Sequence, residues 1–197
     1  MRTASVIINL LIFSTTAALV VQCFRRKGRC DPARGRAAFR YFTVLSNALC
    51  ALAALAMAVC QIRGRVSPAV LMFKYLGTAS LSVTLATVLA FLGPTMGYRE
   101  LLSGGNLYLH LLGPLLAIAS FCFLEKGDMA FSSALAGLIP VALYGALYLY
   151  RVVFAPEGRR WDDFYGFNRG GHWPASFAAM MAGTLLICVG LYYLQNL

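Results

Sequence analysis

Apolar positions along this chain are grouped in long blocks, and short segments with charges, glycine or proline separate the blocks. Each block approaches the roughly 20 residues that an α-helix needs to cross a bilayer. The sequence therefore predicts an all-α polytopic membrane protein, a six-transmembrane-helix bundle that forms a single domain over residues 1–197. The expected spans are 5–24, 41–61, 70–92, 107–124, 131–151 and 174–194.

The connections between these runs are too short for a second domain. The longest covers 152–173, and loops of about 22 residues are often lids or binding elements. Its aromatic side chains also suit the membrane–water interface. Two interpretations of this loop stay open: a lid over a site, or an aromatic anchor whose charges pair with one another.

Composition agrees with a membrane location. The chain is 60% hydrophobic and 12% charged, and its mean hydropathy is +0.72. Of its 17 basic residues, seven lie between the first two runs, where a polybasic stretch meets anionic headgroups. Nucleic acid is not an expected partner, because base-stacking aromatics do not alternate with these charges in a soluble module. Membrane lipids are the expected partners. The seven residues are Arg25, Arg26, Lys27, Arg29, Arg34, Arg36 and Arg40.

Basic residues also predict the orientation. The loops after the first, third and fifth spans carry twelve of them, and the opposite side carries five. The positive-inside rule then makes the odd-numbered loops cytoplasmic. We therefore expect a plasma-membrane protein with both termini on the outer side of the membrane.

Neither a metal nor a cofactor is expected. The six cysteines show no CxxC spacing and no spacing to histidine that is typical of a zinc site or a disulfide framework. No carboxylate stands at a ligand spacing from His110.

Two of the predicted helices carry polar residues along one face, at steps of four and three. In the second helix this face runs from charged to polar to small, and in the fourth every residue on it is polar or small. Small residues let membrane helices approach closely, so both faces are expected to point inward. The two stripes are Arg36, Arg40, Thr43, Asn47, Cys50 and Ala54, and Asn106, His110, Gly113, Ala117 and Ser120.

Thr43 and His110 are expected at similar depth, because both of their helices begin at the same membrane face. An ionisable side chain within a span often marks function, and His110 is the one clear example in the sequence. Imidazole is well suited to activate a hydroxyl near neutral pH. The pair is therefore a candidate for acyl transfer. In the alternative interpretation, Thr43 only bonds a carbonyl of its own helix.

Two segments resemble signature segments of the androgen-induced protein/ADTRP-like family: FRYFTVLSN at 39–47 and NLYLHLLGP at 106–114. That family comprises six-span membrane proteins, and its characterised animal members hydrolyse fatty acid esters of hydroxy fatty acids with an intramembrane threonine and a histidine. The resemblance implies that Thr43 is the nucleophile and His110 the base of a lipid-ester hydrolase. The short chain and compact loops resemble bacterial-type relatives more than the animal enzymes.

Several polar residues are candidates for a supporting role. Asn47, with Ser46 in a similar role, either donates to a developing oxyanion or bonds a neighbouring helix. The imidazole is oriented either by Asn106 or by an acid of the last loop, Asp162 or Asp163.

Other residues are candidates for binding the substrate. Arg40 either holds a carboxylate or reaches toward headgroups, and Tyr144 and Tyr148 either line an acyl pocket or fill the core. Trp161 and the two loop acids contribute if the loop is a lid. Lys74 is expected to snorkel outward.

The lead hypothesis is an integral-membrane hydrolase of lipid-like esters. The alternative is a non-enzymatic transporter, channel or lipid-binding scaffold, although an ion-driven transporter usually needs several buried ionisable groups.

Overall fold

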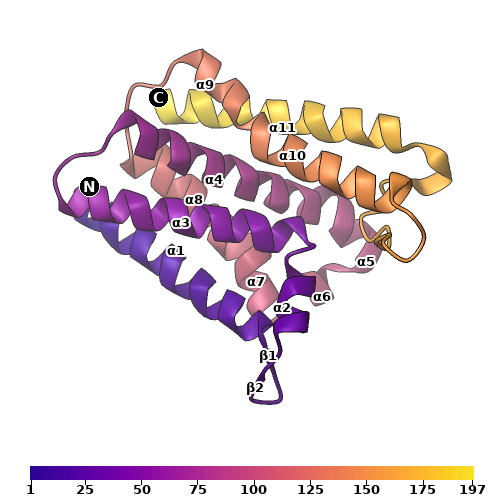
Figure 1. The fold of residues 1–197 in the computed structure, drawn as a ribbon. Coiled ribbons are helices and arrows are strands. Elements are labelled where there is room, and N and C mark those ends of the chain that lie inside the picture. Colours follow the sequence, from indigo (N-terminus) through magenta and orange to yellow (C-terminus); the bar gives the residue numbers. More distant parts are fainter.

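The computed structural model describes all 197 residues, and six helical segments in it are long and apolar enough to cross a membrane (Figure 1). This confirms the predicted all-α bundle of six spans. Each observed span overlaps its predicted range, and most are longer by a few residues. The segments are Arg2–Cys23, Phe42–Ile62, Pro68–Met96, Gly105–Leu124, Phe131–Phe154 and Trp173–Asn196.

The first two spans are single α-helices, α1 (Arg2–Cys23) and α3 (Phe42–Ile62), with the short α2 (Pro32–Ala38) between them. The third consists of α4 (Pro68–Thr87), the π-helical η1 (Val88–Leu92) and α5 (Gly93–Met96), and α6 (Tyr98–Leu101) follows it. The fourth consists of α7 (Gly105–Leu107), the π-helical η2 (Tyr108–Leu112), α8 (Gly113–Ala119) and the π-helical η3 (Ser120–Leu124).

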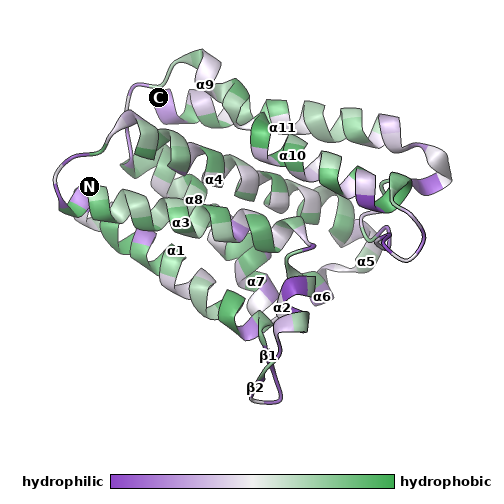
Figure 2. Cartoon of the chain, viewed as in Figure 1, coloured by the Kyte–Doolittle hydropathy of each residue, from purple (hydrophilic) through white to green (hydrophobic).

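The fifth span consists of α9 (Phe131–Ala136), α10 (Leu138–Leu149) and the π-helical η4 (Tyr150–Phe154). After the long loop and the 3₁₀ turn η5 (Arg169–Gly171), α11 (Trp173–Asn196) forms the sixth. Hydrophobic residues cover the long helices, and hydrophilic residues gather at their ends (Figure 2).

Local sequence signals explain several helix boundaries. Asp31 caps α2, because its carboxylate accepts a hydrogen bond from the Arg34 amide at 3.0 Å. Ser67 caps α4 in the same way. Two of the π-helical turns directly precede a Gly-Pro pair, at Pro94 and Pro114. Proline has no amide hydrogen for the regular helical bond, so a widened turn at these positions follows from the sequence.

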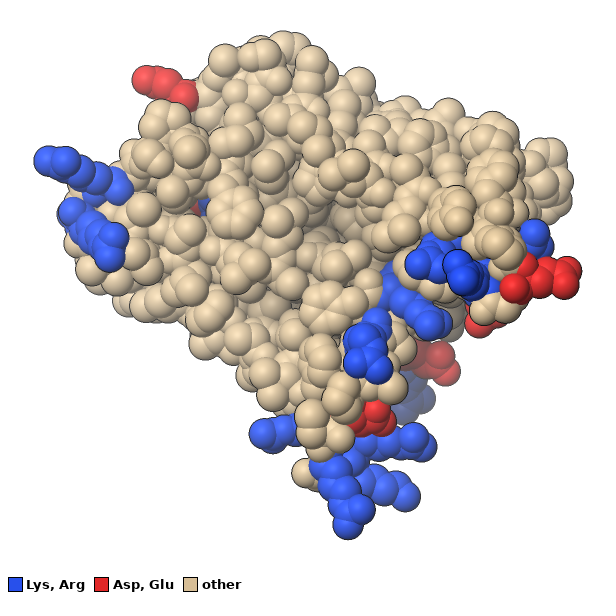
Figure 3. All heavy atoms as spheres, in the orientation of Figure 1, with Lys and Arg blue, Asp and Glu red and all other residues tan.

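The polybasic segment after α1 forms a short β-hairpin instead of an irregular loop. Strands β1 (Arg25–Arg26) and β2 (Arg29–Cys30) pair in antiparallel register around Lys27 and Gly28, both with positive φ. The hairpin projects beyond the bundle, and Figure 3 shows its basic side chains at that end. Both chain termini lie at the other end (Figure 1).

Helices α3 and α4 approach each other closely at a glycine. A Cβ on Gly77 of α4 would lie 2.8 Å from the Cys50 Cα of α3. Any larger residue at position 77 would therefore push these two helices apart.

A buried polar cluster lies near the end of the bundle that carries the termini. The Lys74 ammonium is 3.7 Å from the Glu125 carboxylate, and both side chains are completely buried. Oxygen Oε1 of Glu125 also accepts hydrogen bonds from Ser5, Asn9 and Ser120. These five residues are called the buried polar cluster below.

Two predictions about charge inside the bundle were therefore wrong. Lys74 does not snorkel outward, because Asn9 of α1 accepts a hydrogen bond from its ammonium and Glu125 supplies a countercharge. His110 is not the one ionisable residue within the spans. The predictions failed because both partners of Lys74 come from helices distant from it in sequence.

Replacement of Lys74 by Met alone should strongly destabilise the fold, because it leaves a buried carboxylate without its countercharge. We expect a loss of about 3–5 kcal/mol in the free energy of unfolding, which Lys74→Met combined with Glu125→Gln should largely restore. Thermal unfolding in detergent, followed by tryptophan fluorescence, measures both. Equal destabilisation by the single and double variants would contradict the ion-pair interpretation.

Candidate active site

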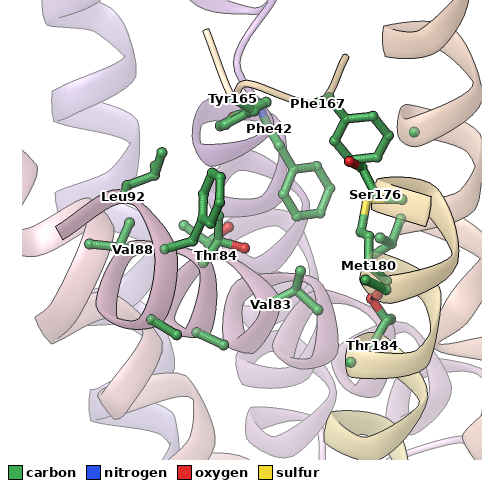
Figure 4. A pocket seen from close by; sticks show the side chains of 18 of the residues that line it. Phe42, Val83, Thr84, Val88, Leu92, Tyr165, Phe167, Ser176, Met180 and Thr184 are labelled. Atoms are coloured by element: carbon green, nitrogen blue, oxygen red, sulfur yellow. Dashed lines mark hydrogen bonds between the residues drawn. The ribbon is translucent and has the colours of Figure 1, made fainter. Parts of the chain in front are cut away.

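An apolar pocket of about 520 Å³ lies at the end of the bundle that carries the long loop. Its walls are the first turn of α3, the second half of α4 with η1, α10, and the first half of α11 (Figure 4). Loop residues 165–167 and Arg169 also line the pocket. Phe42 points into the space between α4 and α11 (Figure 4), and Thr43 lies beside it in the wall.

The first turn of α3 leaves one amide without a partner. The Phe42 amide donates to the Tyr165 hydroxyl at 3.1 Å, and the Val44 and Leu45 amides donate to the Tyr41 carbonyl. The Thr43 amide makes no hydrogen bond. An unpaired amide at a helix N-terminus carries partial positive charge and favours a negatively charged atom nearby. Thr43, a residue of the pocket wall, thus combines a hydroxyl and an unpaired amide.

Tyr165 is the site residue that sequence reasoning did not single out. Burial raises the pKa of Tyr165, and hydrogen bonding to the Phe42 amide and to the Tyr144 and Thr43 side chains lowers it by less. The residue therefore remains a neutral phenol, able to donate its own proton, beside Thr43. The sequence argument relied on helical spacing to assign residues to a face. Tyr165 lies in a loop rich in aromatic residues, where that spacing does not apply, so the sequence did not distinguish it from its neighbours.

The long loop is held in place by Tyr148 and Asp163. The Tyr148 hydroxyl donates to Asp163 Oδ1 at 2.9 Å and accepts from the Tyr165 amide at 3.1 Å. The Asp163 carboxylate also accepts from the amides of Phe167 and Asn168, both at 2.8 Å. Asp163 thus folds the loop and places Tyr165, and it is not a hydrogen-bond partner of the imidazole. Tyr148 therefore both lines the pocket and holds the loop by hydrogen bonds.

The other predicted binding residues divide into two groups. Tyr144 lines the pocket, and its hydroxyl donates to the Arg40 carbonyl at 2.8 Å. Arg40 itself is exposed, and its guanidinium lies 5.9 Å from the centre of the Trp161 ring. Arg40, Trp161 and the exposed Asp162 do not line the pocket, whereas Arg169 of the same loop does.

His110 lies in the π-helical turn η2, nearly buried. Its Nδ1 is 2.7 Å from the Leu101 carbonyl, so Nδ1 carries the proton and Nε2 holds the free lone pair. Asn106, one of the residues expected to orient the ring, is exposed and forms no hydrogen bond with it. Thr43 lines the pocket and His110 does not.

Asn47 connects the two helices that carry Thr43 and His110. Its amide nitrogen donates both to the Thr43 carbonyl at 2.8 Å and to the Leu109 carbonyl at 3.0 Å. Both amide protons are then in use, so Asn47 bonds a neighbouring helix and has none left for an oxyanion. Ser46 bonds the Thr84 hydroxyl at 2.7 Å.

The structure contains no cluster of three or more metal-ligating side chains, and all six cysteines are free thiols. Comparisons with protein-family models, curated proteins and solved structures find no match.

The variant Tyr165→Phe should lower the free energy of unfolding by about 1 kcal/mol, because the Phe42 amide loses its acceptor. Since the pKa of Tyr165 is raised in the folded protein, the unfolded chain ionises first, near its ordinary pKa of 10.0. The wild-type advantage should thus be complete below pH 10 and shrink above it.

Melting temperatures of wild type and variant in detergent between pH 7 and about pH 11 measure this. Tyr150→Phe, at an exposed tyrosine without a hydrogen bond, is the matched control. An advantage of wild type that grows above pH 10 would contradict the assignment.

Proposed function

We propose that this protein is an integral-membrane hydrolase of lipid-like esters, with Thr43 as the nucleophile. The observation that carries the proposal is the position of Thr43, with its unpaired amide, in the wall of a large apolar pocket that the neutral Tyr165 also lines. An apolar pocket with few polar groups gathered at one place is typical of a site for an amphiphilic ligand. Fatty acid esters of hydroxy fatty acids are the substrates that the family resemblance suggests.

The reaction begins when Thr43 Oγ1 attacks the ester carbonyl and gives up its proton to a base. The carbon–oxygen bond to the alcohol then breaks, and the base returns the proton to the departing alcohol. Water, deprotonated by the same base, attacks the acyl carbon of the acyl-threonine. The bond from that carbon to Thr43 Oγ1 breaks, the base returns its proton to Oγ1, and the fatty acid leaves. Each step conserves atoms and electrons, and none requires a metal or cofactor.

The oxyanion of the tetrahedral intermediate would be stabilised by the Thr43 amide and the Tyr165 hydroxyl. Both are fixed before the substrate binds, one by the helix and the other by the loop that Asp163 holds. Donors preorganised in a water-poor pocket contribute strongly to catalysis. This assignment replaces Asn47, whose protons are already in use.

His110 is the proposed base. Support comes from the proton on Nδ1, which leaves Nε2 free to accept another, and from Asn47, which connects the His110 helix to the carbonyl of Thr43. Because the ring lies outside the pocket lining, proton transfer would need a water or a small motion of η2, whose π-helical turn is a common feature of functional sites.

We propose that the pocket opens on the cytoplasmic side of a plasma membrane. The basic hairpin and the long loop lie at the same end of the bundle, opposite both termini (Figures 1 and 3). Basic residues concentrate at this end, and the positive-inside rule then leaves both termini outside.

The variant Thr43→Ala should lower ester hydrolysis by about 10³-fold or more, because it removes the nucleophile. It should also abolish labelling by a fluorophosphonate probe, whereas Thr43→Ser should keep both. Thr87→Ala, at another threonine of the same pocket, is the matched control and should keep activity within about twofold. Full activity in Thr43→Ala, or a wild type inert toward every lipid ester, would refute the proposal.

The buried polar cluster supports a second candidate, an ion-coupled carrier. Ionisable residues buried in a membrane bundle commonly mark proton or ion pathways. Lys74 lies within the third span, Glu125 directly follows the fourth, and both side chains are completely buried. Solute flux into sealed vesicles that persists without Thr43 and His110, and stops in Glu125→Gln, would favour the carrier. No flux with any tested solute, together with Thr43-dependent hydrolysis, would exclude it.

A further inference from the structure

A second apolar cavity, of about 240 Å³, opens on the surface between α3 and α10. Leu45 and Leu49 of α3 form one wall, Leu143 and Leu147 of α10 form the other, and Ser80 of α4 lies in the lining between them. In Figure 1, α4 is visible between these two helices. The cavity is called the lateral groove below.

The lateral groove faces the region that the bilayer occupies. Leu143 is 68% exposed and Leu147 is 44% exposed, and both belong to the fifth span. The serines add no free polarity, because Ser80 bonds the carbonyl of its own helix and Ser46 bonds Thr84. The chemistry of the groove therefore fits an alkyl chain and nothing charged.

The lateral groove and the Thr43 pocket share a wall made of Phe42 and Tyr144. The centres of these two rings are 5.0 Å apart. Tyr144 is held by its hydrogen bond to the Arg40 carbonyl and by stacking on Tyr148. The Phe42 ring has no polar atom that could form a hydrogen bond, and its one aromatic contact is with Tyr144. Phe42 directly precedes Thr43. Rotation of the Phe42 side chain would thus join the two cavities beside the candidate nucleophile.

We infer that the lateral groove binds one alkyl chain of a two-chain lipid ester, while the other chain occupies the Thr43 pocket. The inference rests on the proposed function and adds to it a second chain-binding site, outside the Thr43 pocket. The larger volume of the Thr43 pocket assigns the longer chain to it. Phe42 is then the residue that moves to admit the ester.

The experiment fills the lateral groove without touching the Thr43 pocket. Leu143→Trp introduces a large ring at an exposed position that lines only the groove, and Ile139→Trp, also exposed on α10 but outside the groove, is the matched control. Each variant is assayed on 4-nitrophenyl octanoate, with one alkyl chain, and on oleyl oleate, with two.

We expect Leu143→Trp to lower kcat/KM for oleyl oleate by about tenfold or more, in the range that hydrophobic pockets discriminate, and to leave octanoate hydrolysis within about twofold. Ile139→Trp should change neither. An unchanged kcat/KM for oleyl oleate in Leu143→Trp, relative to wild type, would overturn the inference, because the groove would then hold bilayer lipid only. Loss of octanoate hydrolysis in Thr43→Ala identifies the reaction itself and separates the two proposals.

A binding measurement gives a readout without catalysis. A dialkyl ether with a diazirine on its shorter chain should label α3 or α10 peptides at the groove, and excess unlabelled ether should suppress the labelling. Suppressible labelling in a protein that hydrolyses nothing would support the chain site and refute the hydrolase. Labelling that excess ether does not reduce would show ordinary contact with the bilayer and refute the chain site.

Discussion

The fold depends on the pairing of two charges inside an apolar bundle. An isolated ion in the bilayer core is costly, so Lys74 and Glu125 require each other and a set of hydrogen bonds. Ser5 and Asn9 on α1 and Ser120 in η3 complete the cluster. Gln61 of α3 reaches it through Ser5, and Gln195 of α11 bonds the Glu125 carbonyl. Helices from five spans are thereby connected at one end of the molecule.

The candidate site lies at the opposite end, where hydrogen bonds connect the first turn of α3 and α10 to the long loop. Here α10 and α11 stand far enough from α3 and α4 to leave a pocket, and the long loop covers its end. Aromatic rings and the Asp163 carboxylate hold the loop, so the pocket has a fixed polar end and apolar walls. Such a combination suits an amphiphile that enters from the bilayer with its polar group near the interface.

The sequence led to Thr43 because helical spacing places it on a polar stripe. In the structure, Thr43 lines the pocket. The same reasoning set Asn47 beside Thr43 without showing which atoms its amide binds. Tyr165 was missed, since loop residues have no periodicity from which a face can be inferred. The Leu101 carbonyl was missed as the partner of His110 for a related reason: a main-chain carbonyl carries no residue-type signal. The side chain of Lys74 was predicted to point outward because only its own helix was considered, whereas its partners Asn9 and Glu125 belong to other segments.

What the sequence alone determined is the class of fold and the approximate limits of the spans. The bilayer imposes a length and an apolar composition on each helix, and both can be read residue by residue, as can a proline or a capping aspartate. What only the tertiary structure decided is which helices meet: the Lys74–Glu125 pair, the Asn47 link between two helices, and Tyr165 over the first turn of α3. The residues that these contacts join lie 51 to 123 positions apart in the sequence. The contact energies depend on distance and burial, which are defined only once the helices pack.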